Sequence, residues 1–264
     1  TSDAVWSGIR ARRTNAQTGD NIHLLATLNG VPQGSTFSPT ATSVINIEAI
    51  AGSFIDYIDV VKNGIVVDRI TPSLRPAPVD QLRDEADAIF TLELGWGARG
   101  SHHDWQGSVR VHDGTFDALE PRLRGPEIVS PLEGEDVSER SDHVALEDNR
   151  IHFDIRATSN PNNATAATQA FAARVRLQPG ASFTADFNGM KVEVPAERLY
   201  QGALSGNLGA IDTPAFRFHP LPKADQWQWG GQVSAGALKS GDWVSLRLRQ
   251  TNGQWAWSSA FFCR

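Results

Sequence analysis

The chain has 264 residues, of which 40 % are hydrophobic and 20 % charged, a composition typical of globular proteins and not of disordered ones. Its formal net charge of −6 offers no attraction to nucleic acid or to an anionic membrane, so we expect no nucleic-acid partner. We also expect no membrane insertion, because no run approaches the roughly 20 apolar residues of a membrane span. The single cysteine, Cys263, excludes an internal disulfide and a thiolate zinc cluster.

The cellular compartment stays open between the cytoplasm, the periplasm and secretion, because secreted bacterial proteins can also lack disulfides. The sequence begins at Thr1, without methionine and without a signal-like segment. We therefore expect either that a leader was removed or that the chain was cut from a larger protein.

Residues 2–13 are predicted to form a short helix. Val5, Trp6 and Ile9 share one face of it, and arginines gather toward its C-terminal end. A helix this short is marginal in water, so its apolar face should dock on another surface. We interpret residues 1–20 as a helix and turn left from an upstream domain.

From residue 21 onward the pattern changes to the alternation typical of strands, and residues 21–125 are predicted to form a first β-sandwich-like unit. Asn63-Gly64 indicates a two-residue hairpin turn, because both positions need positive φ. The predicted strands of this unit are 21–30, 43–51, 54–64, 65–70, 86–97, 107–114 and 115–123.

Residues 126–149 are predicted to be an acidic linker, since the stretch 133–148 holds seven acidic residues and one arginine. A second β-sandwich-like unit is predicted over 150–264, with another hairpin turn at Asn188-Gly189. Its predicted strands are 150–158, 170–178, 182–195, 214–220, 226–234, 242–250 and 254–262. The predicted fold class is thus all-β, mainly antiparallel, with two β-sandwich-like units in series and a short N-terminal helix.

One cluster of residues could bind a divalent metal ion. It consists of His102, His103 and Asp104 in a predicted loop, with His112 further along. Adjacent residues on an extended backbone point to opposite faces, so His102 and His103 rarely bind one ion together. An ordinary polar loop is the competing interpretation, and no phosphate loop, nucleophile elbow or zinc motif occurs elsewhere.

The eight tryptophans raise a second possibility, a carbohydrate-binding surface. Trp227 and Trp229 are predicted to share one strand face, as are Trp255 and Trp257, because side chains two apart in a strand point the same way. Coplanar exposed aromatic rings can stack on sugars. The competing interpretation is that these rings fill a sandwich core or an interface between domains.

Five segments, distributed along nearly the whole chain from residue 4 to residue 259, resemble a family. The most specific are 4–35, in which a helix ending in Arg-Arg-Thr precedes a Thr-Gly-Asp turn, and 246–259, with its "QTNGQWAWSS". They resemble the C-terminal β region of an uncharacterised bacterial family similar to the PHP (polymerase and histidinol phosphatase) metal-dependent phosphoesterases. Asn15 departs from the family's frequent tyrosine. The remaining similar segments are 58–67, 92–114 and 213–229.

The resemblance implies that the catalytic domain lies outside this chain. The family's metal site begins with a His-x-His motif, which does not occur here, so no catalytic residue and no cofactor is assigned to the chain. A divalent metal is expected in the missing domain, and that upstream domain is the expected partner. We therefore expect a non-catalytic module that supports or gates a PHP-like hydrolase domain. The alternatives are a glycan-binding module using the tryptophans and an autonomous metal-dependent hydrolase using the His102/His103 loop.

Overall fold

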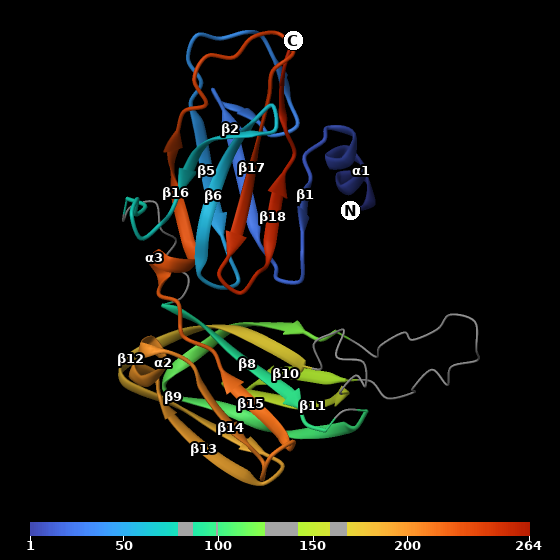
Figure 1. The fold of residues 1–264 in the computed structure, drawn as a ribbon, viewed down its shortest axis with the longest axis vertical. Coiled ribbons are helices and arrows are strands. Elements are labelled where there is room, and N and C mark those ends of the chain that lie inside the picture. Colours follow the sequence, from blue (N-terminus) through green and yellow to red (C-terminus); the bar gives the residue numbers. More distant parts are fainter. Residues whose placement is uncertain (79–86, 99, 125–141, 159–167) are drawn as a thin grey trace, which may run out of the picture. The chain divides into compact units, whose positions relative to one another are not determined.

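The computed structural model describes residues 1–78, 87–98, 100–124, 142–158 and 168–264. Strands dominate the described chain, whose helices are α1 (Ser2–Arg10), α2 (Ala196–Gln201) and α3 (Ala224–Trp227). Strand pairing is antiparallel except where the short strands β4 and β19 meet (Figure 1). The predicted all-β, mainly antiparallel fold class is confirmed. None of the described helices has the length and apolar character needed to cross a membrane.

The chain forms two compact units, and the second is inserted into the first. Unit 1 combines Thr1–Glu85 with Pro222–Arg264, and unit 2 is Ala86–Leu221. In Figure 1 the colours show the same division, because blue and red strands lie side by side in unit 1 whereas green to orange strands make up unit 2.

Unit 1 consists of two sheets. The first contains β1 (Asn15–Gln17), β18 (Trp255–Ser258), β17 (Trp243–Gln250), β6 (Ile55–Lys62), β7 (Ile65–Ile70), β19 (Phe261–Cys263) and β4 (Thr36–Phe37). The second contains β16 (Gln228–Val233), β5 (Ile45–Ile50), β2 (His23–Leu28) and β3 (Val31–Pro32). We call them sheet A and sheet B.

The core of unit 1 is formed where the alternating apolar residues of sheets A and B face each other. Leu24 and Ile47 of sheet B share one buried cluster with Ile58, Leu246 and Leu248 of sheet A. Burying such side chains contributes about 1.5–3 kcal/mol each, which is the main stabilisation of this sandwich.

The strand pairing divides the chain differently from the predicted series of units 21–125 and 150–264. Near the C-terminus, β17 pairs with β6 and β16 pairs with β5, so the last segment of the chain completes the first unit. Period-two alternation identifies a strand and its buried face but does not specify the neighbouring strand. The order of units could therefore not be derived from the pattern.

Unit 2 is built on one continuous sheet. Its strands are β8 (Ala88–Trp96), β9 (His102–Arg122), β10 (His143–Glu147), β11 (Arg150–Thr158), β12 (Thr168–Phe187), β13 (Met190–Pro195), β14 (Leu204–Asn207) and β15 (Pro214–Phe218). The two long strands β9 and β12 pair along most of their length and carry the sheet around one aromatic-rich core. A sheet that bends around its core replaces the two separate sheets expected of a sandwich.

One long strand with an irregularity in its pairing replaces two strands that were predicted separately. The sequence predicts strands at 107–114 and 115–123, but β9 runs through both. Asp113 has a φ of 51°, and the pairing register between β9 and β12 shifts nearby, where Leu177 and Ser182 are consecutive partners. An irregularity of this kind bends and twists a strand without ending it.

The two predicted hairpin turns are confirmed by positive φ at both residues of Asn63-Gly64 and of Asn188-Gly189. The predicted helix 2–13 ends earlier, at Arg10. Most of the predicted acidic linker lies outside the described residues. Its last part, 143–147, is strand β10, which pairs with β11 inside unit 2.

Candidate functional sites

Trp227 and Trp229 do not form the predicted surface pair. Trp227 is the last residue of α3 and is fully buried, whereas Trp229 lies in β16 with only 4 % of its surface exposed. The Trp229 indole Nε1 donates a hydrogen bond to the Arg75 carbonyl at 2.8 Å. The prediction of one shared strand face is wrong, because Trp227 ends a helical turn and the strand begins only at Gln228. Neither ring can present a surface to a sugar.

Trp255 and Trp257 do share one face of β18, as the strand period predicts. Their rings are stacked, with centroids 5.8 Å apart and planes 11° apart, and Trp257 is 38 % exposed. Trp255 is only partly exposed, so the pair is not a fully open platform for a sugar. The free aromatic surface at this place is therefore smaller than the sequence suggests.

Arginines cover more of the same aromatic surface. The guanidinium carbons of Arg247 and Arg249 lie 5.5 and 5.4 Å from the centre of a Trp255 ring, and Arg69 lies 3.8 Å from that of Tyr57. Tyr57 meets Trp255 edge to face at 6.1 Å. Each of these contacts between an arginine and an aromatic ring contributes about 0.5–1 kcal/mol at an exposed site. The aromatic rings and arginines on this surface of sheet A therefore contact mainly one another.

Asp59 lies buried beneath two of these arginines, Arg69 and Arg247. Its carboxylate is fully buried and accepts hydrogen bonds from Arg69 Nε at 2.6 Å and from Arg247 Nη2 at 2.6 Å. Burial on its own raises the pKa of Asp59, but the hydrogen bonds and charges of the two arginines outweigh it, and the pKa lies below its ordinary value. The ionised carboxylate therefore binds β6, β7 and β17 together.

The histidine cluster does not converge. Asp104 is paired with Arg156, at 2.7 Å between Oδ1 and Nε, and the His103 ring packs edge-on against Trp105 at 4.9 Å. His112 Nε2 lies 2.8 Å from Thr184 Oγ1, nine residues and roughly 30 Å further along β9 than His103. Among the described residues, no three histidine, cysteine or acidic side chains come together as a metal site would require.

His102 is an exposed residue at the start of β9 and pairs across the sheet with Thr158. Burial is the largest influence on His103 and lowers its pKa, which favours the neutral ring. A neutral imidazole can bind a metal, but one ligand does not make a site.

We expect the purified chain to carry well under one zinc, manganese or iron atom after dialysis against a chelator, because its candidate ligands point to different partners. Elemental analysis measures this directly. His103→Ala should leave the metal content unchanged and cost about 1 kcal/mol of stability through its lost contact with Trp105. A tightly held metal atom that disappears in this variant would contradict the expectation.

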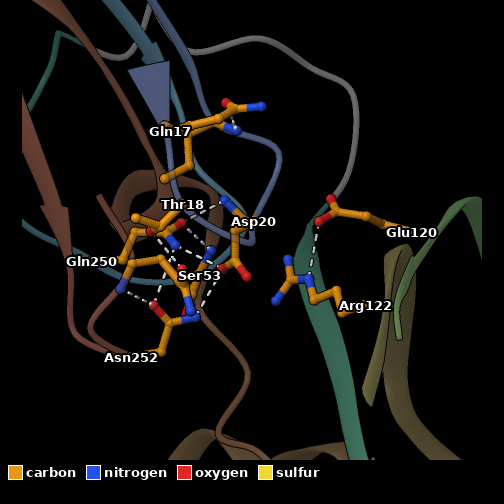
Figure 2. A network of polar contacts seen from close by, with 11 residues as sticks. Gln17, Thr18, Asp20, Ser53, Glu120, Arg122, Gln250 and Asn252 are labelled. Carbon is orange, nitrogen blue, oxygen red and sulfur yellow. Dashed lines mark hydrogen bonds and ion pairs between the residues drawn. The ribbon is translucent and has the colours of Figure 1, made fainter. Parts of the chain in front are cut away.

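A buried polar network that the sequence did not suggest lies at one end of sheet A. Asp20 is 3 % exposed and accepts hydrogen bonds from Gln250 Nε2 at 2.7 Å and from Asn252 Nδ2 at 2.8 Å. Gln250 Oε1 in turn accepts from the backbone N–H groups of Gly52 and Ser53. Figure 2 shows these side chains converging on one point. The network satisfies polar groups that would be costly to bury alone.

This network connects the two most specific segments of the resemblance described above, 4–35 and 246–259. The Thr-Gly-Asp turn at 18–20 and the hairpin turn at 251–253 meet through Asp20 and Asn252, and Thr18 Oγ1 donates to Gln254 Oε1. Both motifs are recognisable in the sequence, but nothing in the sequence indicates that they contact each other. Their role in the described structure is to hold β1 and the β17–β18 hairpin together.

The apolar face of α1 is exposed. Val5, Trp6 and Ile9 are 63 %, 59 % and 49 % exposed, and no residue of the helix is buried. Beyond its end, Arg12 Nε donates to the Gly34 carbonyl at 2.9 Å, and the Arg12 guanidinium lies 5.4 Å from the Phe262 ring. The helix is thus attached to unit 1 through the residues that follow it, while its apolar face contacts no core.

Comparison with models of known protein families found no match to this chain, and comparison with curated proteins found none either. The likeness to PHP-like C-terminal regions therefore stays a prediction. Functional inference rests on the surfaces described above, of which α1 is the most unusual for a globular protein, because an amphipathic helix normally buries its apolar face.

Proposed function

We propose that this chain is a non-catalytic β module that packs through α1 on a metal-dependent hydrolase domain of the PHP-like type, which it supports or gates. The observation that carries the proposal is the exposed face of Val5, Trp6 and Ile9. Burying such side chains in an interface stabilises it by about 1.5–3 kcal/mol each, before the entropic cost of association. The position of α1 just before the β sandwich agrees with the family resemblance of residues 4–35.

The attachment of α1 also suits a docking role. Arg12 ties the chain to Gly34 directly after the helix, and this position of unit 1 is confined, since a side chain at residue 34 would collide with the Arg12 backbone. A helix fixed at one end can present its apolar face in a defined direction. Docking would then couple a partner domain to the strands of unit 1.

Trp6→Asp is expected to weaken binding to the PHP-like domain of the parent protein at least tenfold, because a charge replaces the central apolar side chain of the face. The stability of the chain itself should change by less than about 0.5 kcal/mol, since Trp6 contributes nothing to a core. Calorimetric titration of the separately purified domain with the chain measures the first quantity, and urea unfolding the second.

Ile65→Asp is the matched control, since Ile65 is 69 % exposed and lies on β7, away from α1 in the sequence. It should leave binding unchanged. Equal affinity of the Trp6→Asp variant would contradict the proposal. So would hydrolysis of a phosphoester by the purified chain at a rate that a chelator abolishes.

The carbohydrate alternative draws less support from the geometry. Trp227 and Trp229 are buried, and the partly exposed Trp255 lies beside Trp257 and two arginines. Binding of a glycan at this place would depend on Trp257, which is 38 % exposed, and on the partly exposed ring of Trp255. The alternative of an autonomous hydrolase would need the dispersed ligands of the histidine cluster to be brought together.

A further inference from the structure

A groove lies on the outer face of sheet B, with a cavity volume of about 670 Å³. This volume is within the usual range of ligand-binding pockets. The residues that line it belong to unit 1, so the groove is complete within one unit. Its side chains of interest are Arg13, Asn15, Leu25, Asn46, Glu48 and Gln232.

The groove exists because β16 has no side chain at a central outward position. Gly230 pairs with Glu48, which pairs with Leu25 on its other side. These three residues form one row across the sheet, and this row lacks a side chain at its β16 end. The neighbouring Gly231 is also needed, since a Cβ there would lie 2.8 Å from the Trp229 ring. Gly230 thus lets the backbone itself form part of the floor, whereas the missing side chain at Gly231 makes room for the buried Trp229 ring.

One wall of the groove is held in place by a buried glutamine. Gln33 is 5 % exposed, and its Oε1 accepts a hydrogen bond from the Ala26 N–H at 3.0 Å. Its Nε2 donates to Asn15 Oδ1 at 2.7 Å. This bond uses the acceptor of the Asn15 amide and leaves its two N–H donors for other partners. Asn15 is therefore an oriented donor on the wall.

Several polar groups in the groove have unused hydrogen-bonding capacity. Among the described residues, none pairs with the Arg13 guanidinium or with the side-chain amide of Gln232. Asn46 donates to Thr27 Oγ1 at 3.3 Å, which leaves its carbonyl oxygen as an acceptor. Leu25, 46 % exposed, adds an apolar surface beside them.

The geometry points to an oligosaccharide as the ligand of this groove. Each sugar hydroxyl is both a donor and an acceptor, and planar amide and guanidinium groups can bind neighbouring hydroxyls in pairs. Leu25 would face the C–H surface of a sugar ring. Extended peptides are commonly bound at a sheet edge through main-chain hydrogen bonds, whereas this groove lies on a sheet face. Most of the groove lies on sheet B, whereas Trp255 and Trp257 lie on sheet A, whose strand β1 contributes Asn15 to the groove wall. The site does not depend on docking through α1.

Titration calorimetry of the full chain with hexasaccharides of glucose, mannose, xylose and N-acetylglucosamine tests the inference. We expect at least one to bind, with shifts in the side-chain amide resonances of Asn15, Asn46 and Gln232. The double variant Arg13→Ala/Gln232→Ala should bind it at least tenfold more weakly, because a charged donor and an amide are lost. Both positions are exposed, so the variant should keep the wild-type unfolding midpoint.

Arg110→Ala/Gln201→Ala is the matched control, because it removes the same residue types from exposed positions of unit 2 and should leave binding unchanged. The inference is overturned if no hexasaccharide binds at millimolar concentration, or if an extended peptide binds the groove and no saccharide does. It is also overturned if Trp257→Ala abolishes saccharide binding while the groove variant retains it.

Discussion

Phe187→Ala is expected to lower the free energy of unfolding of unit 2 by about 3–5 kcal/mol, the usual cost of truncating a buried phenylalanine. Phe187 is fully buried at the end of β12 and stacks on Phe216 with ring centroids 4.4 Å apart. It also meets Trp105 and Phe218 edge to face, at 5.9 and 6.1 Å. Removing it opens a cavity among aromatic side chains that are held by several strands and can collapse only partly.

Hydrogen exchange of backbone amides measures this effect separately for the two units. In Phe187→Ala, protection should fall in β9 and β12 and remain at the wild-type level in β17. Ile58→Ala is the reciprocal variant, since Ile58 is fully buried in unit 1, and it should show the opposite pattern at a cost of about 2–5 kcal/mol. Equal loss of protection in both units for both variants would contradict the division into two compact units.

Asp59→Ala is expected to destabilise unit 1 by about 2–4 kcal/mol at neutral pH. The variant removes charged hydrogen bonds to Arg69 and Arg247 and leaves two guanidinium groups without their shared acceptor. The loss should be smaller than that for a fully buried ion pair, because both arginines are partly exposed and can be solvated. Urea unfolding of the two proteins measures the difference.

The pH dependence of that difference has a definite sign. Because the pKa of Asp59 is lowered in the folded protein, its contribution is complete above the unfolded value of about 3.9. It should be lost as the pH falls below this value and through the folded pKa. Asp56→Ala is the control, since the Asp56 side chain is 41 % exposed and lies 3.7 Å from Arg249, and it should cost less than about 1 kcal/mol. If the difference in the free energy of unfolding between the wild type and Asp59→Ala stays constant down to pH 2, the carboxylate charge is not its cause.

Local features of the fold could be predicted because they depend on neighbouring residues. The turn at Asn63-Gly64 follows from the need for positive φ, and the inward face of β17 follows from the alternation of Val244, Leu246 and Leu248. The all-β class follows from many such short patterns. The apolar face of α1 was also visible, because helical spacing brings Val5, Trp6 and Ile9 together.

The candidate sites were predictable only in part. Trp255 and Trp257 lie on one face as the strand period requires, but their stacking and the arginines beside them depend on the neighbouring strands β17 and β6. The groove on sheet B was missed altogether, because its walls come from Arg13 and Gln232, more than 200 residues apart in the chain. No spacing rule links residues that only strand pairing brings together.

The sequence by itself determined the all-β class, the two Asn-Gly turns and the inward face of strands such as β17, since these properties arise from backbone sterics and from the burial of apolar side chains nearby. Only the tertiary structure decided that the last 43 residues complete the first unit, that Trp227 and Trp229 are buried, and that Asp59 is enclosed between two arginines. These outcomes depend on which strands pair, and pairing is chosen by the free energy of the whole sheet and core, to which distant segments contribute together.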